Sequence, residues 1–144
     1  MITLAGHCHC GAIRVELEPG KPVAELPLRA CQCGFCRRHG ARTTSDPMSR
    51  LHIEAAPGAL ERYRFGRRVA EVLLCAECGC YIASTIEADG HLLATLNVAG
   101  VDLAAFAGRV PEPAVYEDES DADRLARRKA RWTPTVLVET SPSA

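Results

Sequence analysis

The chain has 144 residues, which is enough for one ordinary domain with its own hydrophobic core. Its 17 basic and 18 acidic residues leave a formal net charge of −1, so overall charge does not draw it to nucleic acid or anionic lipid. Aromatic residues make up only 5% of the chain, too few for the stacking surfaces that hold single-stranded nucleic acid. We therefore expect a small-molecule partner and no nucleic-acid partner.

The first residues, from Met1 to His7, contain neither a basic nor an apolar segment, so no secretory signal is expected. No apolar run approaches the roughly 18 residues that a membrane-spanning helix needs. We accordingly expect a cytoplasmic protein that does not cross a membrane. In a reducing compartment its eight cysteines should be thiols that bind metal or react, and disulfide bonds are the alternative.

The hydrophobic pattern predicts a mainly β fold in a single domain over residues 1–144. Residues 12–18 alternate apolar and polar side chains, as in a half-buried strand, and Pro19-Gly20 ends the run. Similar short patterns separated by turn-forming residues predict strands at 25–31, 51–54, 60–65, 69–75, 81–87, 91–98 and 135–140.

One longer helix is predicted at residues 120–131. Ser120 is a suitable N-cap, Asp121 and Asp123 place acidic groups in the first turn, and basic residues from Arg127 to Arg131 fill the last turn. The simplest interpretation of this basic segment is a solvated helix face, because the acidic residues just before it nearly neutralise its charge. Short helical turns are also expected after Cys36 and at 102–107.

The cysteines form three groups whose spacing suits metal binding: Cys8 with Cys10; Cys31, Cys33 and Cys36; and Cys75, Cys78 and Cys80. A C-x-C pair on an extended strand places both sulfurs on one face, where they could grip one ion. A C-x-x-C turn also brings two sulfurs together, and the glycine that follows it tolerates a positive φ. Spacing alone leaves open which groups combine.

A site closed by four thiolates is structural, because the ion has no free position for a substrate. Cys31, Cys33 and Cys36 instead offer three sulfurs within six residues and could leave a fourth position open. The alternative is that Cys80 or His39 closes this site as a fourth ligand. Cys80 could equally be a thiol of the hydrophobic core.

The cysteine order resembles that of the glutathione-dependent formaldehyde-activating enzymes, a family that also contains centromere protein V. The resemblance spans roughly residues 6–102 and includes Asn97-Val98 and Asp102 more weakly. Its main residues are Cys8, Cys10, Gly11, Cys31, Cys33, Cys36, Arg37, Cys75, Cys78 and Gly79. The chain departs from the family pattern at Gln32, Gly34 and Cys80, and in a shorter segment after Cys36.

The resemblance implies an all-β zinc fold of the β-tent kind with two zinc ions. It implies a structural zinc on Cys8, Cys10, Cys75 and Cys78, and a catalytic zinc on Cys31, Cys33 and Cys36. The implied reaction is the addition of glutathione to formaldehyde, which gives S-hydroxymethylglutathione.

Other polar residues near these motifs have their own expected roles. Arg37 and Arg38 directly follow the last catalytic cysteine and could bind the carboxylates of glutathione, with solvated arginines as the alternative. His39 could be a general base, whereas the histidines beside Cys8 are expected on the surface. Asp102 is expected in a turn or at a helix cap.

The leading hypothesis is a zinc-dependent carbon-sulfur lyase that acts on glutathione, or another thiol, and a small aldehyde. The alternative is a zinc-stabilised binding module without catalysis, as the centromere relative suggests. A third possibility is a thiol-based redox or metal-storage protein, in which Cys31 to Cys36 would oxidise rapidly and release metal.

Overall fold

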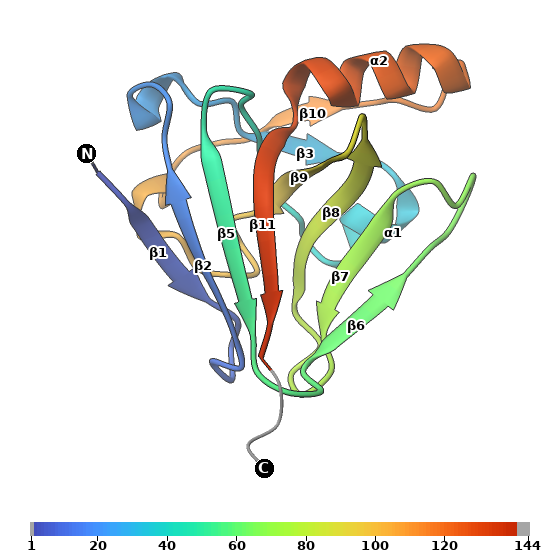
Figure 1. Cartoon of the computed structure of the whole chain (residues 1–144). Coiled ribbons are helices and arrows are strands. Elements are labelled where there is room, and N and C mark those ends of the chain that lie inside the picture. Colours follow the sequence, from blue (N-terminus) through green and yellow to red (C-terminus); the bar gives the residue numbers. More distant parts are fainter. Residues whose placement is uncertain (1, 141–144) are drawn as a thin grey trace.

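The computed structural model describes residues 2–140, which form a mainly β structure built on one 11-stranded sheet. Its first half contains β1 (Leu4–His7), β2 (Ile13–Glu18), β5 (Arg50–Ala55) and β11 (Thr133–Glu139). In this half β2 is antiparallel to β1 and to β5, while β11 runs parallel to β5. Figure 1 shows these strands side by side, with β1 and β11 ending at the end of the sheet away from the long helix.

The second half of the sheet is an antiparallel meander of β6 (Leu60–Tyr63), β7 (Glu71–Cys75), β8 (Tyr81–Ala88) and β9 (His91–Asn97). The residues between β8 and β9, Asp89 and Gly90, both have positive φ, as a tight two-residue hairpin turn requires. β11 joins the two halves, because Thr133 and Pro134 also pair with β9.

Short elements complete the fold and build one end of it. β4 (Thr43–Thr44) pairs with β9 and with β3 (Arg29–Cys31), and β3 pairs in parallel with β10 (Glu112–Ala114). The helices are α1 (Gly34–Arg38) and α2 (Asp121–Arg131), with single 3₁₀ turns at Val23–Glu25 and Ala104–Phe106. Figure 1 places α2 across the end of the sheet near β10 and β8. In the part of the chain described here, neither helix has the length and apolar character needed to span a membrane.

The prediction of a mainly β fold is confirmed, and most predicted strands are present with boundaries shifted by one to four residues. β1, β4 and β10 were not predicted, because each has only two to four residues and shows little alternation. In β1, Gly6 obscures the strand pattern, yet glycine is needed there. A Cβ at this position would lie 2.3 Å from the carbonyl oxygen of Val101.

The main hydrophobic core lies between the two halves of the sheet. Ile13 and Ile53 from the first half and Leu73 and Ile82 from the second half are fully buried in it, together with Phe106. Burying side chains of this size contributes about 1.5–3 kcal/mol each. This core fixes the positions of the strand ends that carry the cysteines.

A smaller hydrophobic cluster lies on the opposite face of β7. Because side chains alternate along a strand, Leu73 faces the main core while Val72 and Leu74 pack in the second cluster. This cluster also contains Tyr81 and Cys36 and holds α1 against the sheet. The β7 strand is therefore buried on both faces, which explains its nearly continuous apolar sequence.

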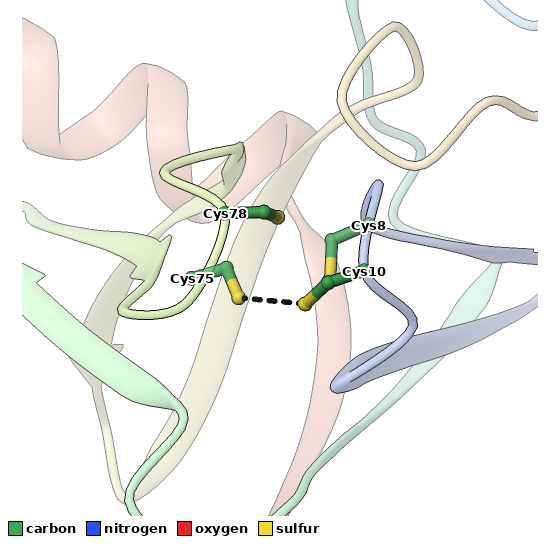
Figure 2. A group of neighbouring side chains, drawn as sticks. All are labelled: Cys8, Cys10, Cys75 and Cys78. Carbon is green, nitrogen blue, oxygen red and sulfur yellow. Dashed lines mark hydrogen bonds between the residues drawn. The ribbon is translucent and has the colours of Figure 1, made fainter.

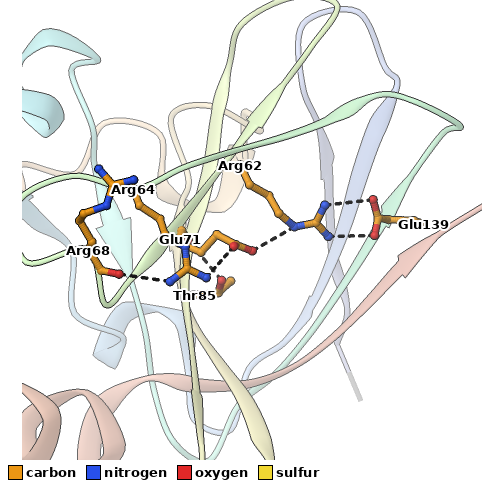
Figure 3. Close-up of polar contacts among 6 residues, drawn as sticks. All are labelled: Arg62, Arg64, Arg68, Glu71, Thr85 and Glu139. Atoms are coloured by element: carbon orange, nitrogen blue, oxygen red, sulfur yellow. Dashed lines mark hydrogen bonds and ion pairs between the residues drawn. The ribbon is translucent and has the colours of Figure 1, made fainter.

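An ion-pair network on the outside of the sheet connects the end of β11 to the β6–β7 hairpin (Figure 3). Arg62 donates two hydrogen bonds to Glu139, at 3.3 and 2.8 Å, and a third to Glu71 at 3.0 Å. Arg64 donates to the other oxygen of Glu71 at 2.9 Å. Exposed pairs of this kind are individually worth only about 0–1 kcal/mol, so the network adds modestly to the strand pairing.

The long helix expected at residues 120–131 is present as α2, and the hydroxyl of Ser120 accepts a hydrogen bond from the amide of Asp123 at 3.1 Å. The short helix expected after Cys36 begins earlier, at Gly34, and includes Cys36. The difference arises because the sulfur of Cys33 acts as the N-cap and accepts a hydrogen bond from the amide of Cys36 at 3.3 Å.

Candidate metal centres and the adjoining cavity

Four cysteines from two distant turns converge at one end of the sheet. The sulfurs of Cys8, Cys10, Cys75 and Cys78 all lie within 4.8 Å of one another. The sulfur of Cys10 lies 3.7 Å from that of Cys8 and 3.6 Å from that of Cys75. Figure 2 shows the four side chains pointing toward a common centre from the β1–β2 and β7–β8 turns. These residues could hold one metal ion.

The C-x-C pair lies in a turn, which corrects the expectation that it lies on an extended strand. β1 ends at His7, and the amide of Gly11 donates to the carbonyl of Cys8 at 3.0 Å to close the turn. Gly11 has a φ of +83°, which a residue with a side chain rarely adopts. The turn, and not strand alternation, therefore brings the two sulfurs together.

Backbone amides aimed at the sulfurs suit thiolates in this group. The amide of Ile13 donates to the sulfur of Cys8 at 3.3 Å. Burial acts to raise the pKa of Cys78, but hydrogen bonds from the backbone of Cys80 and Cys10 outweigh it and lower that pKa to about 6. Four thiols with amide donors around them form the donor set that zinc takes in closed sites, so the residues fit such an ion.

The second group of cysteines lies at the junction of β3 and α1: Cys31 ends β3, Cys33 caps α1 and Cys36 lies within it. The sulfurs of Cys31, Cys33 and Cys36 lie within 4.8 Å of one another, and Cys36 is buried in the second hydrophobic cluster. Hydrogen bonding with Cys36 lowers the pKa of Cys31 to about 6, helped by the charge of Arg127, and the same sulfur contact raises the pKa of Cys36. Cys31 is therefore mainly a thiolate at neutral pH. The three sulfurs could hold a second metal ion.

Among the described residues, the other two considered as metal ligands, Cys80 and His39, do not join the three-sulfur group. Cys80 packs against the main hydrophobic core instead. His39 is the C-cap of α1, and the centroid of its ring lies 4.4 Å from that of Phe35. His7 is exposed as expected, and so is His9.

A cavity of about 710 Å³ opens beside the three-sulfur group. Cys31, Cys33 and Cys36 lie on its wall together with Tyr81, whose hydroxyl is 2.7 Å from that of Ser84. Burial raises the pKa of Tyr81, so its hydroxyl stays protonated at neutral pH. The volume is within the range of small-molecule sites, roughly 300–1,000 Å³.

Comparison with known proteins identifies the family of this chain. The family model described as glutathione-dependent formaldehyde-activating enzyme matches residues 3–117. The chain belongs to this family. A crystal structure of a Rhodobacter sphaeroides protein is similar at 30% sequence identity, with a TM-score of 0.53, and the match covers 78% of this chain and 100% of that one.

In this family member the two arginines predicted to bind substrate differ in position. Arg37 lies on the cavity wall, with its Nε donating to the carbonyl of Gln32 at 3.1 Å. Arg38 is exposed, donates to the carbonyl of Gly34 at 2.8 Å, and does not line the cavity. Asp102 is an exposed turn residue with a φ of +51°, in agreement with the turn expected there.

Four further arginines on the cavity wall were not expected from the sequence. Arg124, Arg127 and Arg128 of α2 line it, as does Arg29 of β3. The α2 residues lie outside the segment that the formaldehyde-activating family model matches. The expectation of a fully solvated basic face on this helix is therefore wrong, because all three side chains are only partly exposed. The signal in the sequence was the spacing of the three α2 arginines, because residues at i, i+3 and i+4 share one side of a helix.

Proposed function

We propose that this protein is a zinc-dependent carbon-sulfur lyase that joins a thiol, such as glutathione, to formaldehyde. The observation that carries the proposal is the contrast between the two cysteine groups. The first has four sulfurs within 4.8 Å and can close around an ion, whereas the second has three sulfurs beside a cavity of small-molecule size. The family of enzymes to which the chain belongs supports the same reaction class.

The proposed reaction forms one carbon–sulfur bond. The sulfur of the thiol attacks the carbonyl carbon of formaldehyde, the C=O π bond breaks, and the proton of the thiol ends on the oxygen of the new hydroxymethyl group. The atoms balance without an oxidant or reductant. The step is faster when more of the thiol is present as thiolate and when the two reactants are held together.

Each part of the cavity wall has a proposed role in this reaction. Cys31, Cys33 and Cys36 are the ligands of a catalytic zinc, which when bound would favour the thiolate form of the substrate. Arg37 supplies positive charge at the edge of the cavity. Tyr81, held by its hydrogen bond to Ser84 and protonated at neutral pH, can donate a hydrogen bond to a bound oxygen.

The proposal includes a second, structural zinc on Cys8, Cys10, Cys75 and Cys78. Its role would be to connect the β1–β2 turn to the β7–β8 turn. A single domain over residues 1–144, the β-tent architecture and a cytoplasmic location stay predictions.

The test is a zinc count together with an exchange measurement. Zinc per chain is determined on protein purified under reducing conditions, and the formation of S-hydroxymethylglutathione is followed by two-dimensional NMR exchange with ¹³C-formaldehyde. We expect two zinc ions and accelerated exchange for the wild type, and one zinc and no acceleration for a folded Cys33→Ala variant. Cys80→Ala is the matched control, because it removes a thiol outside the three-sulfur group, and it should keep zinc and activity.

Two outcomes would favour other functions. One zinc per chain, unaffected by Cys33→Ala, would leave the zinc-stabilised binding module as the better hypothesis. Two zinc ions without exchange, combined with rapid oxidation of Cys31 to Cys36 and metal release, would favour a redox or storage function.

A further inference from the structure

The cavity beside Cys31, Cys33 and Cys36 has an unusually cationic wall. Seven arginines line it, but only two carboxylates, those of Glu117 and Asp121. A zinc ion with three thiolates would carry a net charge of −1, so it would offset only a small part of this charge. Four of the seven arginines lie on β3 and α2: Arg29, Arg124, Arg127 and Arg128.

Several of these arginines have carboxylate partners. Arg67 pairs with Asp121, and Arg127 donates two hydrogen bonds to Glu119, at 2.8 and 3.0 Å. Arg124 lies 3.6 Å from the same carboxylate of Glu119. These pairs hold α2 in place and neutralise part of the wall.

Arg128 and Arg29 differ from these arginines. In the described part of the chain neither has a carboxylate partner. The Nε of Arg128 is buried and has no hydrogen-bond partner among residues 2–140, and its guanidinium lies 5.0 Å from the centroid of the Trp132 ring. Arg29 makes one side-chain hydrogen bond, to the hydroxyl of Ser45 at 3.1 Å.

An unpaired guanidinium in such a place is costly for the protein. Removing a cation from water without a counter-ion is unfavourable, so buried charges in proteins are normally paired. Burial lowers the pKa of Arg128 to about 10, which still leaves the side chain charged at neutral pH. The guanidinium fork is suited to a carboxylate, to which it can donate two parallel hydrogen bonds.

We propose that Arg128 and Arg29 form a carboxylate-binding subsite that selects a thiol substrate carrying a carboxylate group. This inference rests on the proposed function, because it assigns the substrate class of the same cavity. The substrate then places its carboxylate at Arg128 and Arg29 and its sulfur at the three-sulfur group. A neutral thiol of similar size would lack the first of these contacts and bind more weakly. Arg128 lies beyond the segment matched by the family model, whereas Arg29 lies within it.

The test measures binding without chemistry, so that it stands apart from the lyase assay. The probe is S-methylglutathione, whose sulfur cannot become a thiolate, and its diethyl ester is the matched ligand without carboxylates. Affinities are measured by calorimetry on the zinc-loaded wild type, Arg128→Gln and Arg29→Gln. We expect each variant to bind S-methylglutathione about tenfold to a hundredfold more weakly, as for the loss of a charge-assisted hydrogen bond, and to bind the ester as the wild type does.

Controls separate this result from misfolding and from a general charge effect. Lys129→Gln removes one positive charge from the same helix, at a residue paired with Asp89 outside the cavity, and should leave affinity unchanged. Arg128→Lys keeps the charge but loses the guanidinium fork, so its affinity for S-methylglutathione should lie between those of the wild type and Arg128→Gln.

Equal affinity of the wild type and Arg128→Gln for S-methylglutathione would overturn the proposal. Equal affinity of the wild type for S-methylglutathione and for its diethyl ester would overturn it as well. A wild type that binds the acid selectively but shows no lyase activity would overturn the proposed function alone.

Discussion

The sulfur of Cys10 lies 3.6 Å from the sulfur of Cys75, although 65 positions separate these residues in the chain. One belongs to the β1–β2 turn and the other to the end of β7, so the contact joins the two halves of the sheet at the end away from α2 (Figure 1). A metal ion on this group would act as a cross-link between strand ends, and its binding free energy would add to the stability of the fold.

Removal of this cross-link is expected to unfold the protein or weaken it severely. Cys10→Ala should lose one zinc and should lower the free energy of unfolding by several kcal/mol, since structural zinc contributes on the order of 10 kcal/mol in small zinc domains. The measurement is zinc content together with thermal unfolding by circular dichroism. Cys33→Ala, which should lose the other zinc, is the comparison and should stay folded. Equal melting temperatures for Cys10→Ala and the wild type would show that the four-sulfur group is not structural.

The two thiols Cys31 and Cys36 are expected to differ in reactivity once zinc is removed from their group. Hydrogen bonding with Cys36 lowers the pKa of Cys31 to about 6, so its alkylation by iodoacetamide should reach half its maximal rate near pH 6. The pKa of Cys36 is raised and its side chain is buried, so it should react much more slowly. Mass spectrometry of peptides after short labelling would measure both rates.

Two controls test the cause of this difference. Cys36→Ala removes the side chain that is the main cause of the low pKa, and the midpoint for Cys31 should move upward toward that of an ordinary thiol. Addition of zinc should protect Cys31 from alkylation. A midpoint near pH 9 for Cys31 in the zinc-free protein would contradict the proposed geometry of the group.

Much of the central sheet could be predicted from the sequence because its strands alternate or form short apolar runs. β2 alternates apolar and polar residues because only one of its faces is buried, and β7 is continuously apolar because both of its faces are. The three cysteine groups were also evident, since ligand spacing is a local property. The sequence did not show which of these groups converge, because the contact between Cys10 and Cys75 depends on how distant turns meet.

The cationic wall of the cavity could not be predicted for a similar reason. The sequence shows that α2 is a basic helix, but a helix of this composition is usually solvated. Its position over the cavity depends on the pairing of β10 with β3 and on the entry of β11 into the sheet directly after Trp132. These are long-range contacts of short elements, for which local patterns carry little information.

Asn97 at the end of β9 is expected to be important for stability. Its side chain donates to the carbonyl of Tyr81 at 2.9 Å and accepts from the amide of Arg42 at 3.0 Å, and it is fully buried. Asn97→Ala would leave both backbone groups without a partner, at a cost of about 1–3 kcal/mol each. Urea unfolding should show a lower midpoint at an unchanged slope. His91→Ala, an exposed change on the same strand, should have little effect, and equal stability of both variants would contradict this role.

The N-cap of α2 is expected to influence both stability and ligand binding. Ser120 accepts a hydrogen bond from the amide of Asp123, and replacement of such a cap by alanine costs about 1 kcal/mol. Because α2 carries Arg128, Ser120→Ala should also weaken the binding of S-methylglutathione severalfold, although the side chain does not line the cavity. Hydrogen exchange of the α2 amides, together with calorimetry, would measure the two effects.

The comparison with Ser120→Asp separates the role of the cap from that of the serine side chain itself. Aspartate is an equally good cap and its charge suits the start of a helix, so this variant should keep the slow exchange of α2 and the wild-type affinity. If Ser120→Ala loosens α2 but leaves affinity unchanged, the arginines of this helix do not hold the ligand. If both variants lose affinity while α2 stays ordered, the serine itself contacts the ligand and the cap is not the cause.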